Sequence, residues 1–175
     1  KNHFQKNIKG VLLVSNYKTE KTPAEILSRL EKIKKILIVS NEKLITDFKN
    51  IGYDVSTKVS ALDISDNFKG QTVPKFLNGF DVKIKVYKEY RRLHVLYVDS
   101  LIEIVTFLKN KFHSYSIKNG ILIFTHESDL QVFNDSIKNI GKAENDVLEL
   151  YGKDKIFQKE LIQKIDALRA RKFNH

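Results

Sequence analysis

Short apolar runs alternate with longer amphipathic segments along most of this chain. Runs of three to six apolar residues are typical of strands that are buried on both faces of a sheet. The amphipathic segments repeat apolar residues at helical spacing; Ile26, Leu30 and Ile33 share one helix face in the first of them. The pattern predicts strands at 11–14, 36–39, 53–55, 93–98, 121–124 and 147–150, and helices at 24–34, 41–52, 99–112, 128–141 and 157–172.

Two further segments follow other patterns. Residues 81–88 alternate strictly between apolar and polar positions, which predicts a half-exposed strand at a sheet edge. From about 56 to 80 the periodicity fades, and Asp, Asn, Gly and Pro residues become frequent. These residue types form turns, so we expect a loop-rich insertion there.

The alternation of strands and helices predicts an α/β fold. We expect a doubly wound, mostly parallel sheet in a flavodoxin-like three-layer sandwich. Residues 1–34 would add a strand and a helix to that sheet, and residues 35–175 would form the main domain with its insertion. Sites in such folds lie at the carboxyl ends of the central strands, which here are 40–42, 99–100 and 125–127.

The residues at these strand ends carry a family resemblance. Ser40, Asn41 and Glu42 follow one apolar run, Asp99 follows another, and Thr125 follows a third, 26 residues after Asp99. In this order residues 35–172 resemble the receiver domain of bacterial response regulators, whose first strand ends in acids, whose third ends in a phospho-accepting aspartate and whose fourth ends in a threonine or serine. The resemblance implies a receiver-like fold in which these five residues line one crevice.

Departures from the receiver pattern affect its chemistry. Ser40 and Asn41 stand where the family has metal-binding acids, and Leu150-Tyr151 stands where it has Lys-Pro. Phosphorylation of an aspartate in this family needs Mg²⁺ held by oxygen ligands. The resemblance therefore implies a degenerate receiver, or pseudo-receiver, without phosphorylation chemistry. Asp99 fits better as a helix N-cap, and Thr125 as a turn former.

Composition narrows the remaining classes of protein. The chain has 175 residues, of which 42% are hydrophobic and 30% charged, a globular balance with enough apolar material for a core. It lacks cysteine, which excludes disulfides and thiolate sites, and it lacks methionine even at position 1, so we expect a piece of a longer protein. No run of about 18 apolar residues occurs, and we expect a cytoplasmic location.

The charge suggests a second function. The formal net charge is +10, from 26 lysines and five arginines against 21 acids. Such a surface attracts polyanions, although the lysine bias also fits a solvated coat. Cations interleaved with tyrosines can bind nucleic acid or an acidic protein groove, or they can form a solvated edge strand that binds no ligand. The candidate residues are Lys83, Lys85, Tyr87, Lys88, Tyr90, Arg91 and Arg92.

No enzyme motif is recognisable, and His126, Glu127 and Asp129 match no zinc spacing, so we predict no enzyme activity, metal or cofactor. The apolar stripe of the last predicted helix either completes the core or continues as a coiled coil. The leading hypothesis is a non-catalytic signalling or scaffold domain that binds a protein partner or an adjacent domain. The alternative is a nucleic-acid-binding accessory domain that uses residues 81–92. The stripe consists of Phe157, Leu161, Ile165 and Leu168.

Overall fold

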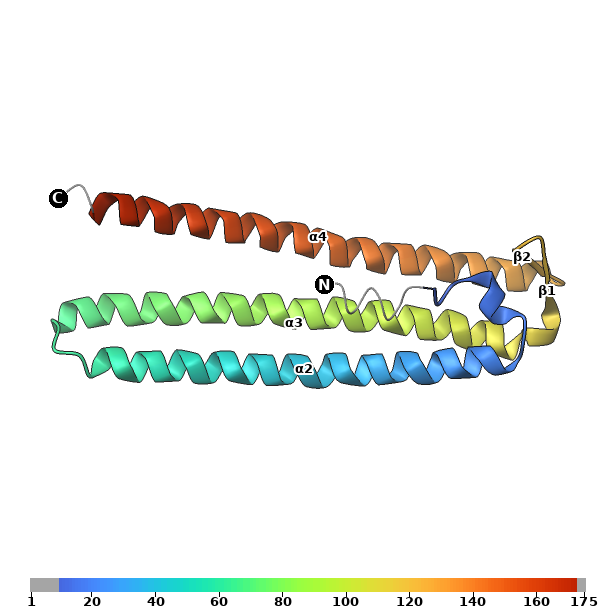
Figure 1. Ribbon diagram of the computed structural model, residues 1–175, viewed down its shortest axis with the longest axis horizontal. Coiled ribbons are helices and arrows are strands. Elements are labelled where there is room, and N and C mark those ends of the chain that lie inside the picture. The colour runs from blue at the N-terminus through green and yellow to red at the C-terminus, as the bar shows by residue number, and fades with distance from the viewer. Residues whose placement is uncertain (1–9, 173–175) are drawn as a thin grey trace.

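The protein is built from three long helices and one small β-hairpin. The computed structural model describes residues 10–172, and within them the side chains of 10–153, 155 and 159. Figure 1 shows the three helices running lengthwise, with a tight turn at one end and the hairpin at the other. In chain order the elements are η1 (Val14–Tyr17), α2 (Lys21–Ser60), α3 (Asp66–Asn110), η2 (Phe112–Ser114), β1 (Tyr115–Lys118), β2 (Ile121–Phe124) and α4 (Glu127–Lys172).

Helices α2 and α3 form a long antiparallel pair. Two ion pairs fix its register: Lys34 Nζ lies 2.7 Å from Asp99 Oδ1, and Arg91 lies 3.2 Å from Glu42 Oε1. The turn between the helices is residues 61–65, and Ser65 ends it because its hydroxyl accepts a hydrogen bond from the N–H of Phe68. In this register residue 34 lies beside residue 99, and residue 42 lies beside residue 91.

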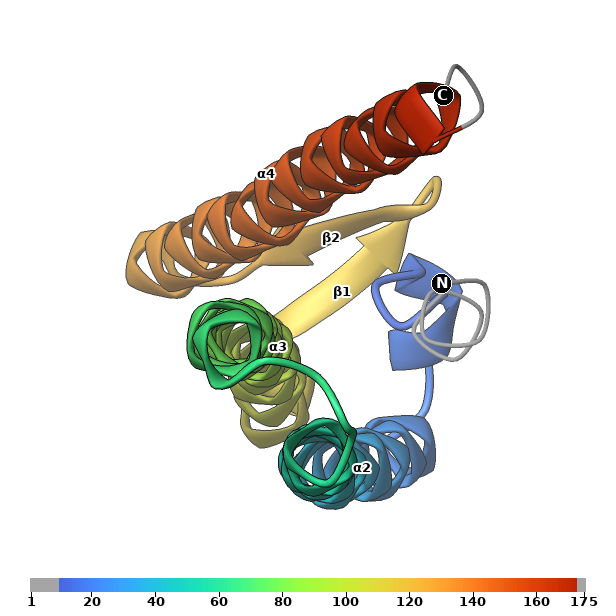
Figure 2. The same cartoon turned by 90° about the vertical axis from the view of Figure 1, so that its left-hand side faces the viewer.

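The β-hairpin reverses the chain between α3 and α4. Asn119 and Gly120 form its two-residue turn and both have positive φ, 51° and 76°, as the type I′ turn that suits a right-handed strand twist requires. Lys111 Nζ lies 3.0 Å from Asp129 Oδ1 and so ties the end of α3 to the start of α4. From there α4 runs back along α3 and diverges from it towards its C-terminal end (Figures 1 and 2).

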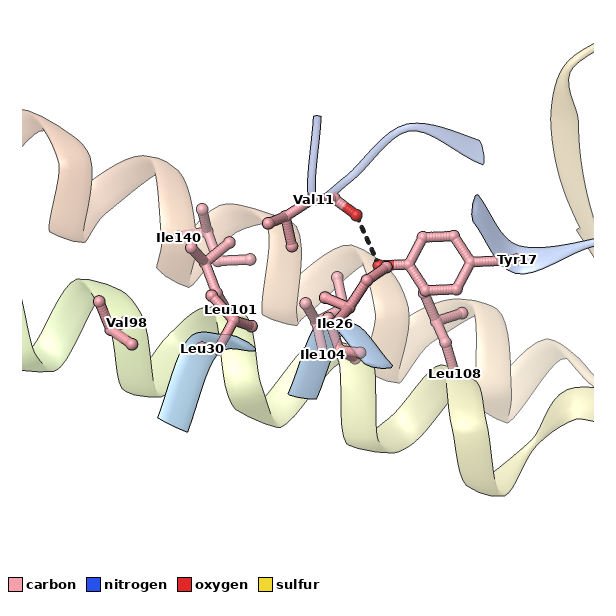
Figure 3. Packing of buried hydrophobic residues seen from close by; sticks show 10 residues of the cluster. Val11, Tyr17, Ile26, Leu30, Val98, Leu101, Ile104, Leu108 and Ile140 are labelled. Atoms are coloured by element: carbon pink, nitrogen blue, oxygen red, sulfur yellow. Dashed lines mark hydrogen bonds between the residues drawn. The ribbon is translucent and has the colours of Figure 1, made fainter. Parts of the chain in front are cut away.

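The buried core lies at the hairpin end of the molecule. The N-terminal residues from Val11 to Tyr17 pack there between the helices, and the Tyr17 hydroxyl donates a 2.8 Å hydrogen bond to the Val11 carbonyl (Figure 3). We call this end, residues 10–40 and 93–140, the base, and the rest of the α2–α3 pair, residues 41–92, the arm. The core residues are Val11, Tyr17, Ile26, Leu30, Val98, Leu101, Ile104, Val105, Leu108 and Ile140.

The predicted α/β class is wrong. The only sheet of the described residues has two antiparallel strands, so the doubly wound, flavodoxin-like and receiver-like sandwich is absent. Only the strand at 121–124 is confirmed, and it is not buried on both faces as predicted, since Ile121 and Ile123 are 63% and 45% exposed. Of the predicted strand at 11–14, residues 11–13 lead into η1 and Val14 is its first residue; the other predicted strands, 36–39, 53–55, 81–88, 93–98 and 147–150, lie inside α2, α3 and α4.

The apolar runs are wrongly predicted to be strands because four consecutive residues complete about one turn of a helix. In α2, Leu37 and Ile38 are half-buried while Ile36 and Val39 on either side of them are exposed. Gly52, which the sequence suggested as a helix end, lies inside α2, where the arm helices come close and leave 3.6 Å between an added Cβ and the Leu77 side chain. A glycine at close packing therefore looks like a stop signal in the sequence alone.

The predicted domain boundary and the predicted insertion correspond to different elements from those expected. Residues 34 and 35 lie within α2, and the expected insertion at 56–80 is the end of α2, the turn and the first third of α3. Among the described residues, no helix combines the length and apolar character needed to cross a membrane.

Candidate functional site

The residues predicted to line a receiver-like crevice do not come together. Ser40 lies in α2, where its hydroxyl donates to the Ile36 carbonyl, and Glu42 beyond it pairs with Arg91. Asp99 lies inside α3, not at a helix start, so its predicted role as an N-cap is wrong. Thr125 follows β2 in the base, where its N–H donates to the Ser114 carbonyl. Asn41 is half-buried in α2.

The positively charged residues of 81–92 spread around a helix instead of sharing a strand face. Lys85 and Lys88 are exposed, whereas Arg91 turns towards Glu42 on α2. Arg92 binds the Glu89 carboxylate through two hydrogen bonds of 2.9 and 2.6 Å. These hydrogen bonds lower the pKa of Glu89, and the same contact raises that of Arg92. Arg91 and Arg92 of this set are thus engaged by acids of this chain.

Tyrosines of the same segment face inward and build an aromatic cluster. Tyr87 stacks on Phe48 of α2 with ring centroids 5.2 Å apart, and Tyr90 is buried beside Tyr151 of α4 at 5.0 Å. Lys83, the remaining residue of the candidate set, is half-buried. The cluster joins all three helices where α4 passes the arm, so these rings pack within the fold.

His94 forms a polar link at the same place, which sequence reasoning missed. Its Nδ1 lies 2.7 Å from the Tyr90 carbonyl, an acceptor, so Nδ1 carries the proton. Its Nε2 lies 3.2 Å from the Tyr151 hydroxyl on α4. Burial lowers the pKa of His94, partly offset by the backbone hydrogen bond, so the neutral ring bridges α3 and α4. The sequence signal was a histidine placed among apolar residues at helical spacing.

A charged cavity of about 330 Å³ opens between α3 and α4 near this link. Its charges largely neutralise each other, since Arg92 binds Glu89 and Lys153 lies 2.8 Å from Glu149. That contact lowers the pKa of Glu149 and raises that of Lys153. In the described part of the chain, no three His, Asp or Glu side chains gather as metal ligands. The lining residues are Glu89, Arg92, Leu93, Asp146, Glu149, Leu150 and Lys153.

Large apolar side chains are exposed at the far end of the arm. Leu62 and Ile64 in the turn and Phe68 at the start of α3 are 53%, 37% and 57% exposed. We call these three residues the apolar tip. Within the turn and the first turn of α3, Asp63 and Asp66 offset Lys69, whose Nζ lies 3.9 Å from Asp66. The tip is thus apolar with little net charge.

The stripe predicted on the last helix lies in α4, which extends to Lys172, but the side chains of Phe157, Leu161, Ile165 and Leu168 are outside the described residues. Comparison with protein-family models, with curated proteins and with solved structures finds no match to this chain.

Proposed function

We propose that this protein is a non-catalytic helical scaffold that binds a protein partner through the apolar tip. The observation that carries this proposal is the exposure of Leu62, Ile64 and Phe68 at the end of a long helical pair. Removing apolar surface from water contributes about 25 cal/mol per Å², so three such side chains in one spot favour association. An exposed apolar patch on a protein surface commonly marks an interaction site.

The arm holds the tip in a defined position. Ser65 caps α3 and accepts from the N–H of Phe68, and the Ile64 N–H donates to the Leu62 carbonyl at 3.0 Å. Behind the tip, Phe76 and Phe80 pack with ring centroids 4.8 Å apart, and Phe80 also contacts Phe48 of α2. A preorganised surface loses less conformational entropy on binding than a mobile loop does.

Charge favours a protein partner over a membrane surface or nucleic acid. Asp63 and Asp66 lie among the tip residues, and carboxylates next to an insertion point oppose contact with anionic lipid or phosphate. The cations of 81–92 are distributed over several faces of α3 and partly paired, which leaves little continuous positive surface for a polynucleotide. The charge pairing in the cavity between α3 and α4 likewise supports a non-catalytic role.

Photocrosslinking tests this proposal. A benzophenone amino acid is placed at position 68 in one sample and at position 36 in another, because Phe68 and Ile36 are both exposed apolar residues of helices but only Phe68 belongs to the tip. We expect a protein adduct at position 68 that is absent at position 36. With that partner purified, Phe68→Ser should weaken binding at least tenfold, while Ile36→Ser leaves it unchanged.

Two results would contradict the proposal. One is identical adducts from positions 68 and 36, which would indicate nonspecific contact. The other is tip-dependent binding to phosphatidylcholine–phosphatidylserine vesicles in a flotation assay without any protein adduct, which would make the tip a membrane contact.

A further inference from the structure

The outer edge of strand β1 carries backbone groups that pair with no strand in the described part of the chain. Lys118 and Ile121 flank the two-residue turn and form a hydrogen-bonded pair, so the pairs alternate from there. The 2.9 Å bond from the Thr125 N–H to the Ser114 carbonyl fits this alternation. The N–H and C=O groups of Tyr115 and Ile117 therefore point away from β2. Among the described residues, none of these four groups makes a backbone hydrogen bond outside the hairpin.

A groove of about 450 Å³ runs along this edge. Three consecutive β1 residues line it and no β2 residue does, which places the groove on the side of β1 that lies away from β2. Figure 2 shows β1 between β2 and the N-terminal residues of the base. The opposite wall is Tyr17 and Lys18, held near β1 by the 3.3 Å hydrogen bond from the Tyr115 hydroxyl to the Tyr17 carbonyl.

The groove offers positive charge and aromatic rings. Of its lining residues, Lys18 carries a positive charge, exposed His113 adds ring nitrogens, and no acid is present. Phe112 and Tyr115 meet edge to face with centroids 6.0 Å apart and form an apolar floor. The lining residues are Tyr17, Lys18, Phe112, His113, Tyr115, Ser116 and Ile117.

We propose that this groove binds an extended acidic peptide segment of a partner protein, which adds a third strand to β1. The outward N–H and C=O groups of Tyr115 and Ile117 would hydrogen-bond the peptide backbone. Lys18 would pair with a carboxylate of the peptide, because the groove lacks any acid of its own to neutralise that lysine. Alternate peptide side chains would lie on the rings of Phe112 and Tyr115. This site lies at the opposite end of the molecule from the apolar tip and does not depend on it.

Fluorescence anisotropy with two labelled hexapeptide pools tests the proposal. In one pool glutamate alternates with randomised apolar residues, and in the other lysine replaces glutamate. We expect the glutamate pool to bind at least tenfold more tightly than the lysine pool. Methylation of all the peptide nitrogens should abolish binding, because the peptide edge that faces β1 then has no N–H group to donate. Free glutamate at equal carboxylate concentration should not compete.

Variants of the chain separate the groove from general surface charge. Lys18→Glu should weaken binding of the glutamate pool at least tenfold, whereas Lys118→Glu, an equal charge change on the exposed face of β1 outside the groove, should change it less than twofold. Ile117→Pro removes one outward N–H without removing a β1–β2 hydrogen bond, and should also abolish binding. Phe68→Ser in the apolar tip should leave peptide binding unchanged.

Several results would overturn the proposal. Equal losses of peptide affinity in Lys18→Glu and Lys118→Glu would show that only net charge matters. Undiminished binding of the methylated peptides would exclude strand addition. Sedimentation that shows a dimer, dissociated by Ile117→Pro, would assign the edge to a second copy of this chain. Absence of binding by the glutamate pool at millimolar concentration, in a chain of native circular dichroism, would also refute it.

Discussion

The base and the arm use the same two helices but bury them to different extents. In the base, α4, the hairpin and the N-terminal residues cover the α2–α3 pair, and Leu30, Val98 and Ile104 are completely buried. In the arm, where α4 diverges, only Gly52, Ile84 and Tyr90 are buried. Two helices alone bury only the stripe between them, so a third layer decides how much core forms. The base is therefore the main source of stability, and under the proposed function the arm presents the apolar tip.

Truncation of one leucine in each region is the largest expected contrast. Leu101→Ala in the base removes a side chain that is 1% exposed and leaves a cavity, which should cost about 2–5 kcal/mol of unfolding free energy. Leu77→Ala in the half-buried arm should cost about 1–2 kcal/mol, because solvent and neighbouring side chains can fill the gap. Urea unfolding followed by circular dichroism measures both. Equal losses would show that the arm is packed as tightly as the base.

Loss of one hydroxyl in the base should have an intermediate effect. Tyr17→Phe removes the donor to the buried Val11 carbonyl and leaves that oxygen without its partner, at a cost of about 1–3 kcal/mol. Amide hydrogen exchange should become faster in residues 10–17 than in the parent protein, while exchange in α3 should change less. Tyr53→Phe, a matched change on the exposed arm, should alter neither quantity. Unchanged exchange in Tyr17→Phe would mean that packing alone holds these residues in the base.

The smallest expected effect lies at His94, where α4 passes from the base to the arm. Because burial lowers the pKa of this histidine, the unfolded chain takes up a proton at a higher pH than the folded protein does. Stability should therefore decrease as pH falls below about 6.5, and the loss should level off below the lowered folded pKa. Chemical unfolding at pH 7.5, 6.5 and 5.5 should show this decrease in the parent protein and a flatter profile in His94→Gln.

His113→Gln provides the control for that experiment, since His113 is exposed in η2. It should keep the pH profile of the parent protein. If His94→Gln kept the same slope as well, the link between α3 and α4 would not contribute to the pH dependence.

Several local features follow from the sequence alone. The helical spacing at 24–34 and 99–112 correctly predicts parts of α2 and α3, and the β-rich run at 121–124 is a strand. The hairpin is not among the elements predicted from the sequence, although the adjacent Asn119 and Gly120, which supply the positive φ angles of its turn, are a local signal for one. These features depend on neighbours within one or two turns, so local chemistry is sufficient to specify them.

The tertiary structure alone decided whether the other apolar runs became strands or helices, and which polar residues met. A run such as 36–39 is compatible with either a buried strand or one turn of a long helix. Only packing against a distant segment favours one of the two. The partner of Lys34 is Asp99 and that of His94 is Tyr151, each more than 50 residues away. Spacing along the chain carries no information about such pairs, because they depend on the register in which whole helices pack.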